Sequence, residues 1–421
     1  MKKNTSLRFL CVCFVILTAA TGLLWSNGSQ EQAMTTITFW HHYSEQSAEN
    51  QVLQEILIPE FERQNPDIKV KASSYEWAEL HQKVLVSTNS GMLPDVLRAD
   101  SAWIPEFHEL GILLPMSTTF NDFDKIHHTI LEGPMATAKI DGVYYGLGLN
   151  TNSKIMFYNT KLLKEAGITP PKTLDELFTA AEKLTRTTQG KHIWGYGEPA
   201  LSGWNLLPFI WSNGGDILNK AQTKASGYLD SQKNIDLITH LAAMYKDKYW
   251  GGFTSGSIPM TDGFAQGRYA MIIDGPWKFA ELIGGHKEFT DYDVALMPAG
   301  DGGSIQVLGG EDITICNEAN KNASWEFVKF MTGYFAQTQM ANAGQIPVNI
   351  KAIDSPEVRK IPNLGLFLDA IKTAKARPAL AEWSKIDEII TLSITSTMLG
   401  EDSASHSLSL AAQEIDNLLM K

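Results

Sequence analysis

Short β-prone apolar runs alternate with longer amphipathic stretches at the beginning of this chain. The runs at 36–40, 68–72 and 95–99 have the length of strands. The stretches at about 48–64 and 76–88 carry apolar residues at helical spacing. This β-α-β-α-β order predicts an α/β fold in which a largely parallel sheet is covered by helices.

The same alternation continues through the rest of the chain. Further strands are expected at 155–159, 193–197, 269–273, 293–298 and 306–315, and the region 354–421 reads as mostly helical. Thr173 and Glu176 have the spacing of a capping box, and Asp141-Gly142 predicts a hairpin turn. The 421 residues are too many for one ordinary core, so we expect two domains.

The most informative run is Tyr269–Ile273, which has the length of a buried strand and stops at Asp274-Gly275-Pro276. Trp277 follows directly, just beyond the carboxyl end of that strand, which is where ligands bind in open α/β sheets. An indole there offers a flat apolar face that suits the C–H side of a sugar ring. A core Trp that caps the sheet fits the same position.

Loops at 41–44, 73–76 and 100–103 follow the three strands of the first part and should share one rim of the sheet. Ser101 has the position of a helix N-cap. Each polar residue in these loops could equally be a helix cap or a solvated loop residue. The candidate ligand-binding residues at this rim are Trp40, His41, Tyr75, Glu76, Asp100 and Ser101.

Charge and composition narrow the class of protein. The net charge is −12, and Lys and Arg form no dense run, which argues against a nucleic-acid partner. Eleven Trp and 12 Tyr suit either carbohydrate binding or a large core. Cys316 would be the only thiol of an exported chain, and its place in a strand-like run indicates a small buried hydrophobe rather than a nucleophile.

Residues 1–26 have the pattern of an export signal, with Lys2, Lys3 and Arg8 ahead of a long uncharged apolar run. We therefore expect a periplasmic or other extracytoplasmic location. Cys11 and Cys13 fall too early in that run for a lipoprotein signal, and an uncleaved anchor stays open.

The motifs of common enzymes are absent, so no catalytic residue, cofactor or metal is expected. The chain has no Gly-x-Ser-x-Gly and no phosphate-binding Gly-x4-Gly-Lys-Ser/Thr. His41 and His42 are adjacent on extended chain and point opposite ways, which disfavours a zinc site. Glu311 and Asp312 diverge for the same reason and do not form a glycosidase pair.

Several segments together resemble the extracellular solute-binding proteins of bacterial ABC importers, in particular the sugar-binding family with maltose- and glycerol-phosphate-binding members. The segments are Ile37–His41, Phe61–Val70, Tyr158–Leu163, Pro171–Leu177, Asp274–Trp277 and Leu308–Glu311. The resemblance implies a two-lobe periplasmic-binding-protein fold of type II, each lobe a mainly parallel sheet flanked by helices. It implies an N-terminal lobe of 35–147 with 299–344 and a C-terminal lobe of 151–294 with 349–421. Three crossings near 147–151, 294–298 and 345–348 would form the hinge.

The resemblance also implies ligand contacts in the space between the lobes. Trp277 matches a sugar-stacking Trp, and Gly309, Gly310 and Glu311 match a loop that meets ligand hydroxyls. The other positions implied are Asp100 on the first lobe and Trp204, Arg377 and Trp383 on the second.

The first hypothesis is a monomeric binding protein that delivers a sugar or oligosaccharide to the permease of an ABC importer. A second is a glycerol phosphate or glycerophosphodiester ligand, with Arg377 facing the phosphate. Two hypotheses from other classes are a secreted glycan-cleaving enzyme and a surface adhesin.

Overall fold

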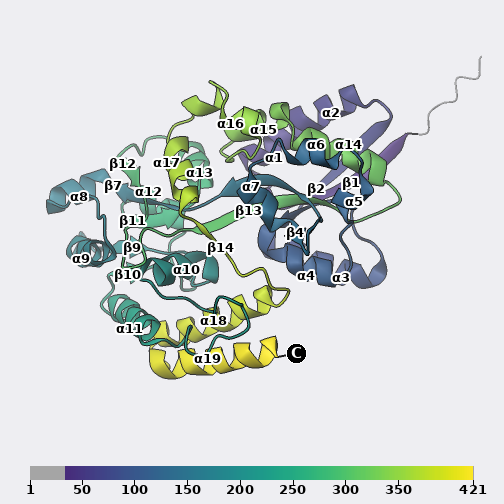
Figure 1. Cartoon of the computed structure of the whole chain (residues 1–421). Coiled ribbons are helices and arrows are strands. Elements are labelled where there is room, and N and C mark those ends of the chain that lie inside the picture. Colours follow the sequence, from purple (N-terminus) through teal and green to yellow (C-terminus); the bar gives the residue numbers. More distant parts are fainter. Residues whose placement is uncertain (1–33, 421) are drawn as a thin grey trace, which may run out of the picture.

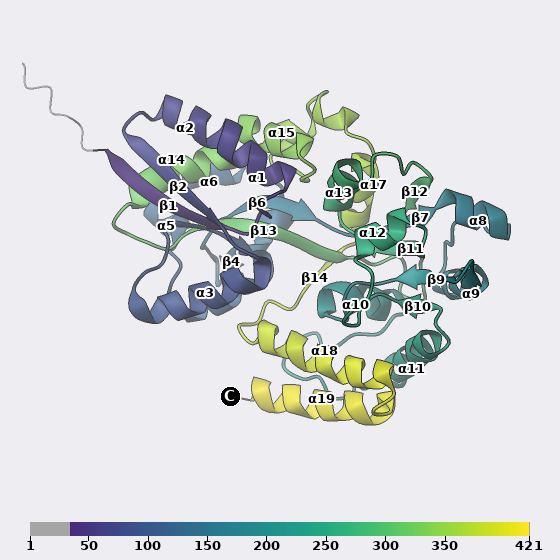
Figure 2. The same cartoon turned by 180° about the vertical axis from the view of Figure 1, so that it is seen from behind.

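The computed structural model describes residues 34–420, which form two six-stranded sheets and a two-stranded hairpin. Figures 1 and 2 show the sheets side by side, with helices over both faces of each. This confirms the α/β architecture with two sheet-centred halves. The expected export signal, residues 1–26, lies outside the described residues. Within 34–420 no helix combines the length and the apolar character needed to span a bilayer.

The first part of the chain builds most of the first sheet. Its elements are β1 (Thr35–His41), α1 (Ala48–Val52), a π-helical turn (Leu53–Leu57), α2 (Ile58–Gln64), β2 (Ile68–Ser74), α3 (Trp77–Ser90), β3 (Val96–Asp100), a 3₁₀ turn (Ser101–Trp103), α4 (Ile104–Glu109), α5 (Met116–Thr119), α6 (Phe123–His127), α7 (Glu132–Thr137), the hairpin β4 (Lys139–Ile140) and β5 (Val143–Tyr144), and β6 (Leu147–Asn152). The π-helical turn immediately precedes the segment containing Pro59, which has no N–H for the regular helical ladder.

The middle of the chain builds the second sheet. Its elements are β7 (Ile155–Asn159), α8 (Thr160–Ala166), α9 (Leu174–Leu184), β8 (Arg186–Thr188), β9 (Lys191–Gly197), α10 (Gly203–Ser212), α11 (Gln232–Lys246), β10 (Trp250–Gly251), α12 (Met260–Ala265), β11 (Tyr269–Asp274), α13 (Trp277–Gly285) and β12 (Tyr292–Ala295). All six residues of β11 are buried, as its apolar run predicted. The capping box of Thr173 and Glu176 is present at the start of α9.

The last part of the chain returns to both halves. Its elements are β13 (Val307–Ile315), α14 (Lys321–Met331), α15 (Tyr334–Asn342), α16 (Ile350–Ile353), a 3₁₀ turn (Val358–Lys360), α17 (Leu364–Lys372), β14 (Lys375–Ala376), α18 (Trp383–Leu399) and α19 (Ala404–Leu419). The short strand β14 lies in the range assigned by sequence to the second lobe, yet it pairs with β13 of the first sheet.

The two sheets are mixed rather than uniformly parallel. In the first sheet β2, β1 and β3 are parallel neighbours, as expected, whereas β13 pairs antiparallel with both β3 and β6. In the second sheet β7 runs antiparallel to β11 and β12. The chain passes between the sheets at β6 to β7, at β12 to β13 and after α15, close to the three expected crossings, and it touches the first sheet once more at β14 before it returns to the second half in α18.

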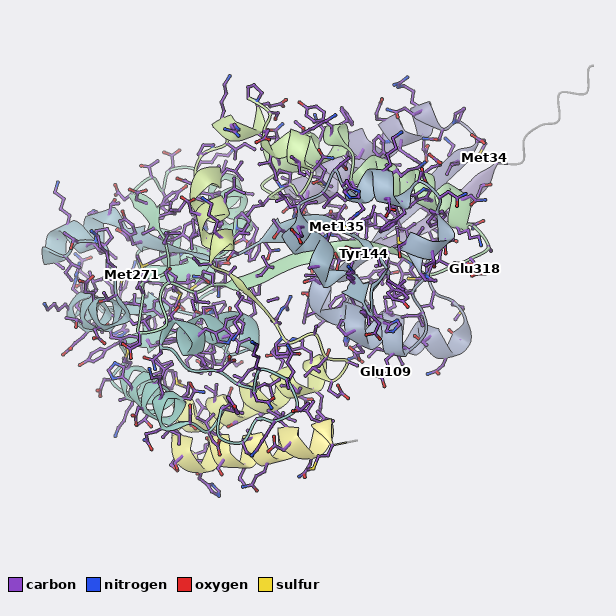
Figure 3. The ribbon with its side chains drawn as sticks, in the orientation of Figure 1. Met34, Glu109, Met135, Tyr144, Met271 and Glu318 are labelled. Atoms are coloured by element: carbon purple, nitrogen blue, oxygen red, sulfur yellow. The ribbon has the colours of Figure 1, made fainter. Side chains whose placement is uncertain are left out.

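Each sheet separates two apolar clusters, which explains why its central strands are buried on both faces. Phe39 and Ile313 of the first sheet face one cluster, and Leu97 and Ala99 face the other. In the second sheet Met271 and Tyr269 belong to opposite clusters. Met271 lies inside the second half, whereas Glu109 and Glu318 lie on the outer surface of the first (Figure 3).

Candidate functional site

The three rim loops of the first sheet come together at one edge. Strands β1, β2 and β3 end at His41, Ser74 and Asp100 and run parallel as neighbours, so their carboxyl ends lie on the same side. Glu311 of β13 pairs in register with Asp100. This edge therefore holds Asp100, Glu311 and the residues that follow β1 and β2.

His41 is placed in the core rather than at the open rim. Its side chain is completely buried between Phe39 and Tyr43, and neither ring nitrogen has a hydrogen-bond partner. Burial, aided by the positive charge of Arg98, lowers the pKa of His41 to about 3, so the imidazole is neutral. A ligand at the rim has no access to this side chain.

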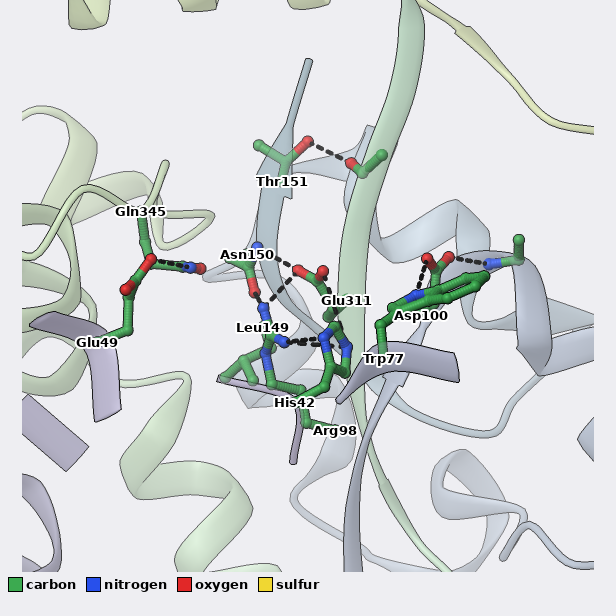
Figure 4. A network of polar contacts seen from close by, with 12 residues as sticks. His42, Glu49, Trp77, Arg98, Asp100, Leu149, Asn150, Thr151, Glu311 and Gln345 are labelled. Carbon is green, nitrogen blue, oxygen red and sulfur yellow. Dashed lines mark hydrogen bonds and ion pairs between the residues drawn. The ribbon is translucent and has the colours of Figure 1, made fainter. Parts of the chain in front are cut away.

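Arg98 is the centre of a buried polar network shown in Figure 4. Its Nη2 lies 2.8 Å from Oε2 of Glu311, and its Nη1 lies 3.0 Å from both ring nitrogens of His42. The same Glu311 oxygen accepts a hydrogen bond from the side-chain amide of Asn150 on β6. Burial raises the pKa of Glu311, and the charge of Arg98 opposes that shift. The carboxylate of Glu311 is therefore already bonded to side chains of the protein.

Sequence reasoning missed Arg98 and Asn150. The available signal was an Arg between the apolar residues of the buried strand Val96–Asp100, because a charged residue on a buried strand requires a partner. Glu311 and Asp312 diverge as expected: Asp312 faces Thr137, whose Oγ1 lies 3.0 Å from Oδ2. They form no pair of facing carboxylates.

Asp100 connects the first sheet to the carboxyl-terminal segment. Its Oδ1 accepts a 2.6 Å hydrogen bond from Nη2 of Arg377, which follows β14, and its Oδ2 accepts a 3.0 Å bond from the indole N–H of Trp77. Oδ1 also accepts from the backbone N–H of Ala102. The N-cap of the 3₁₀ turn is thus Asp100, and the expectation of a cap at Ser101 was wrong, because the Asp100 carboxylate reaches that N–H.

The second half contributes two indole rings close to this ion pair. Trp204 lies in the first turn of α10, and Trp277 is the first residue of α13, just after the two-residue turn that follows β11. Their ring centroids are 6.3 Å apart with a 34° interplanar angle. The guanidinium of Arg377 lies 5.6 Å from the centroid of Trp204. Trp204, Trp277, Arg377 and Asp100 therefore form one continuous group.

Gly309 makes room for the Trp204 ring. A Cβ at position 309 would lie 2.5 Å from Cζ3 of Trp204 and 2.1 Å from Oδ1 of Asn152, closer than side chains tolerate. Gly310, with φ of +144°, has a conformation that glycine adopts far more readily than other residues. These two glycines shape the backbone beneath the indole.

The remaining predicted residues lie around this group rather than in it. Trp40 and Tyr75 pack against each other, with Nζ of Lys83 4.8 Å from the Trp40 ring. Glu76 is exposed at the start of α3, and Trp383 is only 3% exposed, within the apolar cluster of the second half. The structure gives Trp383 a packing environment.

A buried charged cluster lies next to the start of α10, which carries Trp204. Nζ of Lys154 lies 2.6 Å from Oδ1 of Asn205, the neighbour of Trp204, and 3.2 Å from Oε1 of Glu198. The hydroxyl of Tyr196 donates to the other Glu198 oxygen. Burial is the main cause that raises the pKa of Glu198 to about 7. The sequence signal for this cluster was weak, because Lys154 follows an extended polar segment.

The group of Trp204, Trp277, Arg377 and Asp100 carries side chains suited to binding a polar ligand that has apolar ring faces. Indole faces lie beside a guanidinium and a carboxylate, a combination that covers apolar ring faces and bonds to hydroxyl groups. Among residues 34–420 no group of three or more His, Cys, Asp or Glu side chains is placed to hold a metal ion. Cys316 is only partly buried, and desolvation raises the pKa of its thiol to about 12, which disfavours a reactive thiolate.

Comparisons with known proteins match most of this chain to one protein family and to individual binding proteins. The model of the bacterial extracellular solute-binding protein family matches residues 57–365. A binding protein of Brucella abortus (strain 2308) is 27% identical over 86% of this chain and 88% of its own length. The maltotriose-binding protein of Pyrococcus abyssi is 28% identical over 81% of this chain and 73% of its own. The GacH receptor of Streptomyces glaucescens, whose structure was determined without ligand and with acarbose, superposes with a TM-score of 0.82 at 26% identity, covering 92% of this chain and 99% of that one.

Proposed function

This chain belongs to the bacterial extracellular solute-binding proteins, and on that premise we propose that it captures a sugar or oligosaccharide for an ABC importer. The observation that carries the proposal is the group formed by Trp204, Trp277, Arg377 and Asp100. Indole faces suit the C–H side of sugar rings, and the charged groups suit their hydroxyls. The names of the maltotriose-binding relative and of the acarbose-bound GacH receptor support the same class of ligand.

The proposed mechanism is closure of two lobes on the ligand. We take the lobes as 35–147 with 299–344 and 151–294 with 349–421. A ligand that touches Asp100 on one lobe and Trp277 on the other makes both contacts only when the lobes are close. It therefore favours the closed state by the free energy of those extra contacts.

The closed form would then dock on the permease subunits of the importer, outside the cytoplasm. Both parts of the site come from a single chain, so we infer that the protein works as a monomer. The family and its neighbours are binding proteins, and Glu311 and Asp312 point away from each other instead of facing a common bond. We therefore assign no catalytic step.

A thermal-shift and calorimetric screen tests the proposal. The probes are glucose, maltose, maltotriose and the matching mannose and arabinose oligosaccharides. A saccharide that binds only the native state stabilises it by about 2.7 kcal/mol at 100 times its Kd. We expect Trp277→Ala to abolish that shift and Tyr228→Ala, at an exposed aromatic position, to leave it unchanged. Absence of any saccharide shift, or full affinity in Trp277→Ala, would refute the proposal.

Glycerol phosphate is the alternative ligand to include in the same screen. It requires a cation that can face the phosphate, and Arg377 was the predicted one. In the structure Arg377 is already paired with Asp100 at 2.6 Å, and both side chains are about a tenth exposed, at 9% and 11%. A shift with glycerol phosphate but with no sugar would favour this alternative.

A further inference from the structure

We propose that Trp77 forms a second sugar-stacking surface on the first lobe, so that the ligand is an oligosaccharide that reaches from Trp77 to the Trp204–Trp277 pair. The inference rests on the proposed function and adds the ligand's extent. Trp77 is the first residue of α3 and is 46% exposed, the only Trp in residues 34–420 with so open a ring.

The exposed ring of Trp77 is held in a fixed orientation. Its N–H donates to Oδ2 of Asp100 at 3.0 Å, and its ring lies 5.1 Å from that of Trp103 with a 41° interplanar angle. Trp103 is itself 2% exposed and packs against His81 and Phe107. A ring anchored in this way keeps an open face without free rotation, so a ligand that stacks on it loses little side-chain entropy.

The position of Trp77 links it to the site already described. Asp100 bonds Trp77 through one oxygen and Arg377 through the other. The guanidinium of Arg377 in turn lies beside the Trp204 ring. Across the two lobes the groups therefore follow one another in the order Trp77, Asp100, Arg377, Trp204 and Trp277.

This order matches the chemistry of a chain of sugar rings. Each sugar unit presents an apolar face and a rim of hydroxyls, so a linear oligosaccharide meets aromatic and charged groups in turn. A single ring that stacks on Trp277 leaves Trp77 uncovered. Because Trp77 is 46% exposed, its side chain is open to contact with such a further sugar unit.

The test is calorimetry with linear maltooligosaccharides of one to five rings and the matching mannose and arabinose series. We expect Trp77→Ala to weaken the longest bound saccharides by about 10- to 100-fold and the shortest by less than about twofold. Trp77→Phe keeps an aromatic face but loses the N–H donor, so an intermediate loss is expected. Tyr334→Ala, at another exposed aromatic position, is the matched control, and circular dichroism with thermal melting checks the fold of each variant.

The outcomes separate this inference from the proposed function. If Trp77→Ala weakens binding equally at every chain length, or does not weaken it, the proposed role of Trp77 is overturned. The proposed sugar site still stands in that case if Trp277→Ala abolishes binding. If no saccharide of any length binds the wild-type chain, both fail. A loss that grows with the number of rings supports the inference.

Discussion

Glu198 allows a quantitative test of how the second lobe supports its aromatic site. Its side chain is completely buried, with Lys154 3.2 Å from one oxygen and the Tyr196 hydroxyl 2.6 Å from the other. Burial raises the pKa of Glu198 from 4.5 to about 7, although Lys154 and Tyr196 act in the opposite direction. The folded chain therefore keeps a proton that the unfolded chain releases.

The sign and size of the effect follow from proton linkage. Between pH 4.5 and pH 7 the folded state binds more protons at Glu198 than the unfolded state, so the free energy of unfolding decreases as the pH rises. One pKa unit corresponds to about 1.4 kcal/mol, so this group removes about 3 kcal/mol of stability by the time the pH has passed 7. Glu198→Gln has no proton to exchange and should lack this component.

The assay is urea unfolding, followed by Trp fluorescence, from pH 4.5 to pH 8. The stability of Glu198→Gln relative to wild type should change in the variant's favour by about 3 kcal/mol over that range. Glu109→Gln, at an exposed position of α4, controls for removal of an acid that folding does not bury. A constant difference between Glu198→Gln and wild type across this range would refute the reasoning.

Two further predictions concern the contacts that hold the site together. Arg377→Met removes the ion pair to the Asp100 carboxylate at the end of β3 and should lower the free energy of unfolding, measured in urea, by about 1.5–3 kcal/mol. Arg359→Met, which removes an ion pair whose two side chains are more than half exposed, should lower it by less than about 1 kcal/mol. Equal losses would contradict the first. Gly309→Ala should push the Trp204 ring aside, lower the free energy of unfolding by about 1–3 kcal/mol and weaken saccharide affinity by calorimetry. Gly365→Ala, in helix α17 with nothing within 4 Å, should leave the affinity unchanged and should not lower the stability, and unaltered binding in Gly309→Ala would show that the ring tolerates the methyl group.

Much of the fold was predictable because its signals are local. Period-2 and period-3.6 patterns located the strands and helices, and Thr173 with Glu176 marked the start of α9. The six-residue buried strand β11 and its abrupt end also placed Trp277 at a sheet edge. Each of these signals depends on residues a few positions apart, where backbone geometry fixes which side chains share a face.

The site was only partly predictable for the opposite reason. Asp100 and Trp277 were identified from their places after strands, but the ion pair of Asp100 with Arg377 joins residues 277 positions apart. Neither the burial of His41 nor the exposed, anchored ring of Trp77 has a local signal.

The sequence by itself therefore determined the α/β class, the order of elements and the membership suggested by its motifs. The tertiary structure alone decided which charges meet, that β14 joins the first sheet, and which rings are open to a ligand. The physical reason is that periodicity assigns a residue to a face, whereas the partner on that face depends on the order and direction in which distant strands assemble.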